Sequence, residues 1–304
     1  MENRCRSDSG ESCTNWKVIL EIKKPTMNPL FVAVTGLPRS GSTLVCQLLS
    51  QHPDIHCEGQ SSPLGNVLLS VRRMVSDDQF FLAQLDHSFE SAYTNLSSAM
   101  RGFLHGWNRD CRKAAVVDKN RVWLHAVEFL LRIEPNAKLI VCLRELGQVY
   151  GSIEAQHQRT ILLDFVDHLA DFDRFDRADM LFAKDKVIGS QLVSLYAVQD
   201  LPKAVQDHLF FLRFEDLTER PAAHMSDLYT WLGLRPFEID PQKLAPMGPP
   251  ESDSHYHMKF PHSQSTHVNA PQQHEIPPRI QARIEDACAW YYRVHYPGLA
   301  KSTP

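Results

Sequence analysis

A loop that begins at Gly36 has the residue types and spacing of an anion-binding site. In Gly36-Leu-Pro-Arg39-Ser-Gly41-Ser42-Thr43, the two glycines and the threonine match the phosphate-binding pattern G-x-x-x-x-G-K-[ST]. Ser42 stands where that pattern has the lysine that reaches the β- and γ-phosphates. The turn amides and the start of a following helix still attract an anion. We therefore expect an anion of another shape than a triphosphate, with Arg39 as the charge of the loop.

The segments on either side of this loop are the ones that such a site requires. Residues 31–34 are apolar and predict a buried strand, and residues 44–49 carry the apolar stripe of a helix. An ordinary tight turn is the alternative reading, because glycine and proline are common in turns. The strand directly before the loop and the helix directly after it favour anion binding.

Further strands are predicted at 114–120, 138–144 and 208–214, and residues 54–61 are predicted to be a short connection. Helices are predicted at 62–108, 123–131, 148–158, most of 160–199, 223–232 and 279–294, with the charged segment 171–177 facing solvent. Strands that alternate with helices predict an α/β fold with a parallel sheet covered on both faces. Ligands of such sheets bind where the strands end. That rule places six side chains on one rim: Arg39, Glu58, Asp118, Lys119, Arg144 and Phe214.

Composition narrows the class of protein. The 304 residues are 43% hydrophobic and 22% charged, as in an ordinary globular protein with a sizeable core. A net charge of −4 argues against a general binder of nucleic acid or anionic membranes. No apolar run is long enough for a membrane span, and the N-terminus lacks the apolar region of a signal peptide. The seven cysteines show no C-x-x-C spacing, which favours a reduced, cytoplasmic setting.

The chain is predicted to form one domain over residues 29–300. Residues 1–28 have little periodicity and predict a disordered tail, and Met27 is a candidate native start. Residues 244–274 predict a long loop, in which five of the 15 histidines fall between 255 and 274. The pair His255-x-His257 would suit a metal, but a firm third ligand is missing from the pattern, so we predict a polar lid and no metal.

Two of these segments together resemble the sulfotransferases that use 3′-phosphoadenosine 5′-phosphosulfate (PAPS), and the resemblance extends over residues 30–298. Residues 36–43 are similar to the family's 5′-phosphosulfate loop. The strand 139–144, which ends in Arg144 and is followed by Ser152, is similar to its 3′-phosphate site. The resemblance implies a sulfotransferase fold, in which a phosphate-loop-type parallel β-sheet has helices on both faces. PAPS has no γ-phosphate, and its 3′-phosphate needs a separate charge-assisted site. The serine at position 42 is then a mark of the donor.

The resemblance also implies catalytic roles for Glu58, Arg39 and Lys119. Cytosolic small-molecule sulfotransferases usually carry lysine at the position of Arg39, whereas arginine is the pattern of protein-tyrosine sulfotransferases and several bacterial groups. The segment around Glu58 resembles the tyrosine sulfotransferase segment that holds the catalytic base. The segment around Lys119 resembles the one whose lysine stabilises the transferring sulfonyl group. The alternatives are a helix-start carboxylate for Glu58 and a solvated strand-end charge for Lys119.

Donor-binding residues follow from the same resemblance. They are Arg39, Ser40, Gly41, Ser42 and Thr43 in the loop, with Arg144, Ser152, Phe214 and Lys259 elsewhere. Phe214 matches a position where an aromatic ring meets adenine, although a core phenylalanine is an open alternative. Lys259 lies where the family has a loop over the donor. A surface pair is the alternative for Arg144 and Ser152, but an arginine at the end of a buried strand argues against it.

The predicted reaction is in-line transfer of the sulfonyl group of PAPS to an acceptor hydroxyl, with Glu58 as base. A peptide tyrosine is the favoured acceptor, and a carbohydrate or small metabolite stays open. No nucleic-acid or membrane partner is expected, and a homodimer is left open. The alternatives are a nucleotide or small-molecule kinase, which Ser42, Arg144 and Ser152 disfavour, and a non-catalytic nucleotide-binding protein.

Overall fold

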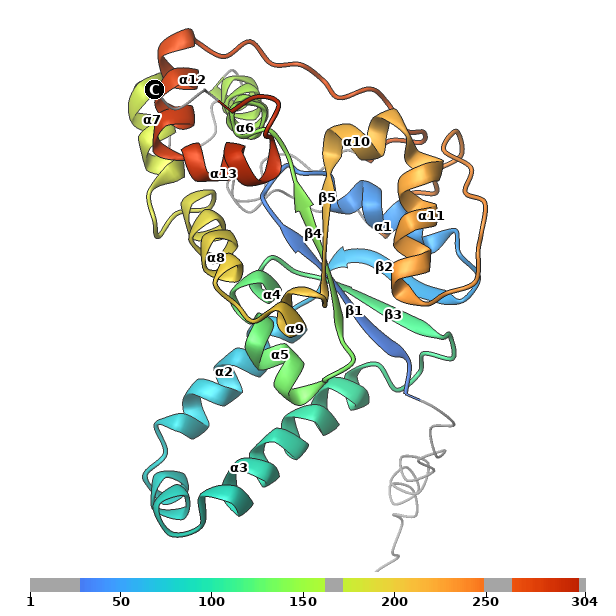
Figure 1. Cartoon of the computed structure of the whole chain (residues 1–304), viewed down its shortest axis with the longest axis vertical. Coiled ribbons are helices and arrows are strands. Elements are labelled where there is room, and N and C mark those ends of the chain that lie inside the picture. The colour runs from blue at the N-terminus through green and yellow to red at the C-terminus, as the bar shows by residue number, and fades with distance from the viewer. Residues whose placement is uncertain (1–27, 162–171, 249–263, 301–304) are drawn as a thin grey trace, which may run out of the picture.

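The computed structural model describes residues 28–161, 172–248 and 264–300, and its centre is a five-stranded, all-parallel sheet (Figure 1). The strand order is β2-β3-β1-β4-β5. The strands are β1 (Leu30–Gly36), β2 (Ile55–Ser61), β3 (Ala115–Lys119), β4 (Lys138–Leu143) and β5 (Leu209–Arg213). This architecture confirms the predicted α/β fold class. Because β1 lies at the centre, the loop that follows it opens between the ends of β3 and β4.

The prediction for residues 54–61 was wrong, because most of this segment forms the edge strand β2. Ile55 and Cys57 lie opposite Ala115 and Val117 of β3, and the register then shifts before Ser61. An edge strand can expose polar side chains to water, so it lacks the continuous apolar run of the buried strands. His56 and Glu58 are exposed for this reason.

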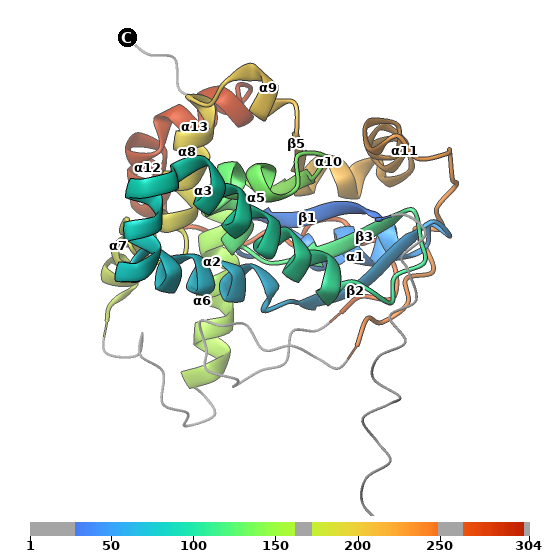
Figure 2. The ribbon, with the colours of Figure 1, turned by 90° about the horizontal axis from the view of Figure 1, so that it is seen from below.

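Helices cover both faces of the sheet. One face packs on α1 (Ser42–Ser50), α10 (Phe214–Glu219) and α11 (Pro221–Leu232). The other face packs on α4 (Val122–His125), α5 (Val127–Ile133), α6 (Leu146–Ile161), α8 (Gly189–Gln199), α12 (Pro278–Ala287) and α13 (Ala289–His295). The helices α2 (Leu64–Ser76) and α3 (Gln79–Trp107) contact each other and extend away from the sheet, opposite α10 and α11 in both views (Figures 1 and 2). The remaining helices are α7 (Arg174–Phe182) and α9 (Lys203–Gln206). None of the helices in the described part of the chain is long and apolar enough to cross a membrane.

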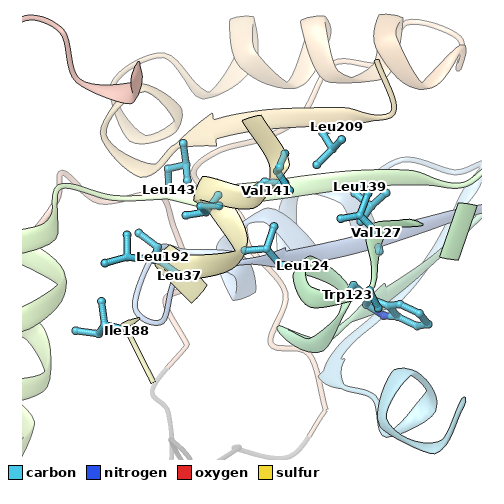
Figure 3. Packing of buried hydrophobic residues seen from close by; sticks show 14 of the residues in the cluster. Leu37, Trp123, Leu124, Val127, Leu139, Val141, Leu143, Ile188, Leu192 and Leu209 are labelled. Atoms are coloured by element: carbon cyan, nitrogen blue, oxygen red, sulfur yellow. The ribbon is translucent and has the colours of Figure 1, made fainter. Parts of the chain in front are cut away.

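Successive side chains of β1 point to opposite faces of the sheet, and both faces are buried, as a strand covered on both sides requires. Val32 and Val34 belong to the cluster under α1, whereas Phe31 and Ala33 belong to the cluster under α4 and α5. In the cluster under α4 and α5, Leu37, Leu124 and strand β4 pack together with α8 (Figure 3). The Trp123 ring is fully buried and meets the edge of Phe31 with a centroid separation of 5.6 Å.

Some helix boundaries differ from the prediction for local reasons. The predicted helix 123–131 is two helices, because Ala126 leaves the helical region at φ −120°. The predicted helix 279–294 is likewise interrupted at Cys288. The prediction that the charged segment 171–177 faces solvent was wrong for Arg177. Its Nη2 donates to Oε1 of the buried Glu154 over 2.6 Å and so ties α7 to α6.

Candidate active site

The loop between β1 and α1 has the backbone shape of an anion cradle. Arg39 and Gly41 adopt left-handed backbone conformations, with φ values of 58° and 85°. Ser40 Oγ donates to the carbonyl of Leu37 over 2.6 Å and so holds the turn closed. Gly41 is the N-cap of α1 and has no side chain to cap the helix. The first amides of α1 can therefore bind a ligand, and the helix dipole favours an anion there.

Gly36 lets the loop start where β1 and β4 lie closest. A Cβ at this position would lie 2.2 Å from the carbonyl oxygen of Cys142, and the φ of Gly36 is +123°. Only glycine fits such a conformation at such a distance. The packing of β1 against β4 therefore fixes where the loop leaves the sheet.

Phe214 connects the loop to Arg144. A Cβ on Gly41 would lie 2.4 Å from the Phe214 ring, so the ring packs directly on the loop. The guanidinium carbon of Arg144 lies 4.9 Å from the centroid of the same ring, within cation–π range. Phe214 is half-buried at the start of α10, directly after β5. It belongs to the site rim rather than to the interior of the core.

Arg144 binds the backbone of Arg39, and the Arg39 side chain binds Ser152. Arg144 is 5% exposed, and its two terminal nitrogens donate to the carbonyls of Arg39 and Gln272, each over 3.1 Å. Arg39 Nε donates to Ser152 Oγ over 3.0 Å. Burial lowers the pKa of Arg144 and the nearby Arg39 charge lowers it further, while the Glu215 charge opposes both effects. Two guanidinium groups thus share one polar corner of the molecule, and an anion would stabilise both.

Lys119 extends from the end of β3 to the other side of the loop. The residue is 7% exposed, and its Nζ lies 3.4 Å from the hydroxyl of Thr43 in the first turn of α1. This burial excludes the alternative of a solvated strand-end charge. The loop residues 40–43 therefore have the cation Lys119 on one side and the cations Arg39 and Arg144 on the other.

Comparison of the sequence with known protein families identifies the family of this chain. Residues 29–238 match the sulfotransferase family. The chain belongs to the sulfotransferase family. This result confirms the resemblance found in the sequence.

Individual relatives of this sulfotransferase-family chain are distant. Protein-tyrosine sulfotransferase 1 of Rattus norvegicus is 31% identical over 126 residues, which are 39% of this chain and 32% of the rat protein. Carbohydrate sulfotransferase 4 of Mus musculus is 26% identical over 271 residues, which are 71% of this chain and 68% of the mouse protein. The chain therefore spans about a third of the rat relative. Among solved structures, the sulfotransferase domain from the curacin biosynthetic pathway aligns with a TM-score of 0.51 at 15% identity. The alignment covers 86% of this chain and 97% of that domain, and it shows a shared fold.

Glu58 lies on the edge strand β2 and is exposed. Its side chain is 79% exposed, and its Oε1 lies 3.5 Å from Nε2 of His56 on the same edge strand. The residue of β2 that aligns with Lys119 is Ser61, three positions further along. Glu58 is thus open to an approaching acceptor, and the His56 imidazole lies beside it.

Asp118 belongs to the buried framework beside the site rather than to the rim. It is 5% exposed and accepts a hydrogen bond from Trp123 Nε1 over 2.6 Å. Desolvation raises its pKa above the ordinary 3.8, although hydrogen bonds from Ser62 and Trp123 oppose the rise. The folded state therefore holds the proton more tightly than the unfolded state. The contribution of Asp118 to the free energy of unfolding consequently falls as the pH rises through the window above 3.8.

Asp118→Asn is expected to keep the Trp123 hydrogen bond while removing this titration. The variant should match or exceed the parent in unfolding free energy at neutral pH. Asp118→Ala should lose about 1–3 kcal/mol, because it leaves the buried indole N–H without an acceptor. Urea denaturation between pH 4 and 7 measures both effects. An Asp118→Asn variant less stable than Asp118→Ala would contradict the framework role.

The sequence analysis did not predict the role of the segment from Gln272 to His274, which borders Arg144. Besides the Gln272 carbonyl on Arg144, this segment is held to α6 through His274. Gln148 Nε2 donates to the His274 carbonyl over 3.1 Å, and the His274 N–H donates to Gln148 Oε1 over 2.8 Å. Gly151 permits this packing, since a Cβ there would lie 2.5 Å from His274 Cβ. Neither backbone carbonyl leaves a signature in the sequence. Lys259, His255 and His257 lie outside the described residues.

Three tyrosines near the C-terminus hold the end of β4, and the sequence reading missed them as well. Tyr291 donates to the carbonyl of Arg144 over 3.0 Å, and Tyr292 donates to Glu145 Oε1 over 2.5 Å. Tyr296 donates to Glu215 Oε2 over 2.8 Å, while Glu215 Oε1 accepts from the Glu145 amide. Burial raises the pKa of all three phenols, so they remain donors at neutral pH. They are positioning residues for Arg144.

Proposed function

We propose that this chain transfers the sulfonyl group of PAPS to an acceptor hydroxyl. The observation that carries the proposal is the pair of neighbouring guanidinium groups of Arg39 and Arg144, of which Arg39 binds Ser152, beside an anion loop whose lysine position holds Ser42. A triphosphate would lack its usual counter-charge in this loop. A donor with one anionic group at the loop and a second beside Arg144 would use the cations on both sides of the loop.

The residues present fit a 3′-phosphate. Arg144 Nε is buried and, within the described part of the chain, has no hydrogen-bond partner. An unsatisfied buried N–H costs free energy that an incoming acceptor would recover. A phosphate also offers the charge that two neighbouring guanidinium groups need. Ser152 completes the corner with a hydroxyl.

In the proposed mechanism, the loop amides and the hydroxyls of Ser42 and Thr43 bind the 5′ group. Lys119 and Arg39 stabilise the sulfonyl oxygens and the charge that grows on the departing phosphate. Glu58 accepts the proton of the acceptor hydroxyl as its oxygen attacks sulfur. The new bond joins that oxygen to sulfur, and the sulfur–oxygen bond to the donor phosphate breaks.

A peptide tyrosine is the acceptor that we favour. The arginine in the loop and the exposed Glu58 on an edge strand support a large acceptor that approaches from solvent. One relative is named for protein tyrosine and another for carbohydrate, so a sugar hydroxyl is the main competitor. The shared fold carries no information on this choice.

Two measurements test the donor and the reaction. PAP, the desulfated product, should raise the melting temperature of the protein, because any ligand of the native state stabilises it. Stabilisation by ATP and not by PAP would defeat the donor assignment and favour a kinase. Transfer of labelled sulfate from PAPS to tyrosine peptides, sugars or phenols then separates an enzyme from a non-catalytic binder.

Glu58→Gln is expected to lower the transfer rate by about 10²–10⁴-fold if Glu58 is the general base. Because the side chain is 79% exposed, the melting temperature and the affinity for PAP should not change. Glu90→Gln on α3 is a matched control, since it also removes an exposed carboxylate. A folded Glu58→Gln variant with the turnover of Glu90→Gln would remove Glu58 from the reaction.

A further inference from the structure

A cavity apart from the anion loop lies between α2, α3, α5 and α8. Figure 1 shows how α2 and α3 extend from the sheet. Its volume is about 440 Å³, within the range of small-molecule sites. The walls are largely apolar and include Leu69, Met100, Val127 and Val198. A ligand with an apolar body would find surface to bury on several sides.

This cavity is distinct from the donor site. Its lining includes none of the residues that meet around the anion loop. Leu124 forms part of its wall, and the Leu124 N–H donates to the Thr35 hydroxyl at the end of β1 over 3.2 Å. Helix α4 thus stands between the cavity and the loop. A ligand in this cavity would not touch the donor.

Two arginines at the cavity are held by aromatic rings. The guanidinium carbon of Arg72 lies 5.4 Å from the centroid of Phe129. Arg132 lies 5.9 Å from the centroid of Tyr93 and donates from Nη1 to the tyrosine oxygen over 2.8 Å. Stacking fixes the plane of a guanidinium group and reduces the entropy lost when it binds a ligand. The carboxylate of Glu128 also lines the cavity, so the fixed charges sum to about +1 and favour a single anionic group.

The opposite wall is polar and neutral. His125 Nδ1 is hydrogen-bonded to the Ser194 hydroxyl, and His125 Nε2 lies 2.7 Å from the side-chain amide of Gln191. Desolvation lowers the pKa of His125, so the ring is uncharged at neutral pH. The ring can contact an apolar or weakly polar part of a ligand without adding charge.

We propose that this cavity is a second binding site, for an amphiphilic organic anion with an apolar body and one carboxylate, sulfonate or sulfate group. Arg72 and Arg132 bind the acidic group, and the apolar walls enclose the body. A nucleotide fits poorly, because its sugar and base would leave many polar groups without partners against these walls.

The probe that tests the site is 8-anilinonaphthalene-1-sulfonate, whose fluorescence rises when it leaves water. N-phenyl-1-naphthylamine has the same aromatic body without the sulfonate and serves as the matched ligand. Titrations are run on the full chain with saturating PAP, so that the sulfonate cannot occupy the donor loop. We expect one sulfonate probe per chain, bound about tenfold more tightly than the neutral probe, as one charge-assisted hydrogen bond would give.

Three variants locate the binding. Ala197→Phe fills the cavity from its exposed rim and should abolish binding of both probes. Arg72→Gln should weaken the sulfonate probe about five- to tenfold and leave the neutral probe unchanged. Arg73→Gln is the matched control, because Arg73 is exposed on the same helix but does not line the cavity.

Equal effects of Arg72→Gln and Arg73→Gln would overturn the proposal, since the charge would then act from a distance. Undiminished binding to a folded Ala197→Phe variant would overturn it as well. The variants locate the probe whether or not PAP binds, so failure of the donor assignment leaves this test intact.

Discussion

Replacing Arg39 by Asn is expected to lower the rate of sulfonyl transfer by about 10²–10³-fold, the usual cost of losing one transition-state donor. Asparagine tolerates the left-handed conformation that Arg39 adopts at φ 58°, so the loop should keep its shape. The backbone carbonyl that accepts from Arg144 is unchanged in this variant. Single-turnover transfer at saturating PAPS isolates the chemical step from binding.

Arg39→Lys is the matched variant for this prediction. Lysine keeps the charge but not the planar fork, so the rate should lie between those of the parent and Arg39→Asn. Arg39→Lys should also lose the hydrogen bond to Ser152 Oγ. A Ser152→Ala variant removes that bond alone and so measures its share of the effect. A near-parental rate in an Arg39→Asn protein that folds and binds PAP would exclude Arg39 from the transfer step.

Replacing Arg144 by Met is expected to weaken PAP binding by about 100-fold or more, because hydrogen bonds to charged groups contribute roughly 1.5–3 kcal/mol each. AMP is the matched ligand, since it has no 3′-phosphate, and its affinity should change far less. The parent protein should prefer PAP over AMP, and the variant should lose that preference. Isothermal titration calorimetry with both ligands measures the two affinities.

The stability of Arg144→Met distinguishes a binding defect from a folding defect. Methionine suits the buried position, and replacing a buried charge by an apolar side chain is often close to neutral. The carbonyls of Arg39 and Gln272 lose a donor, so a modest loss of melting temperature is expected. A folded variant that still discriminates PAP from AMP would place the 3′-phosphate elsewhere.

The fold was predictable where the sequence carries continuous apolar runs. Strands β1, β3 and β4 lie in the interior of the sheet and are largely buried, and each appears in the sequence as such a run or close to one. The edge strand β5 was also predicted, because its first four residues are apolar although Phe211 is exposed. Strand β2 was missed because it is an edge strand with exposed polar residues and Gly59 at φ 74°. Ala126 and Cys288 end helices within apolar stretches whose periodicity continues across the break.

The placement of the candidate residues was predictable where a residue lies at the end of a strand. The loop and Arg144 directly follow β1 and β4, Lys119 is the last residue of β3, and strand ends of a parallel sheet meet at one edge. The contact between Arg39 and Ser152 was not predicted, because it depends on the direction of a long side chain over 113 residues of separation. The backbone carbonyl of Gln272 and the hydroxyl of Tyr291 act through tertiary placement alone.

The tyrosines of α13 bear on the choice of a minimal fragment for expression. The family match ends at residue 238, yet Tyr291 and Tyr292 bind the backbone and side chain at the end of β4. A fragment cut at 238 would retain the strands of the described sheet. It would lose the tyrosines that contact the end of β4 beside Arg144, together with the carbonyl of Gln272. Expression trials guided by the family boundary alone would therefore risk a protein that folds around its sheet and fails to hold the donor. The unit to express extends through α13.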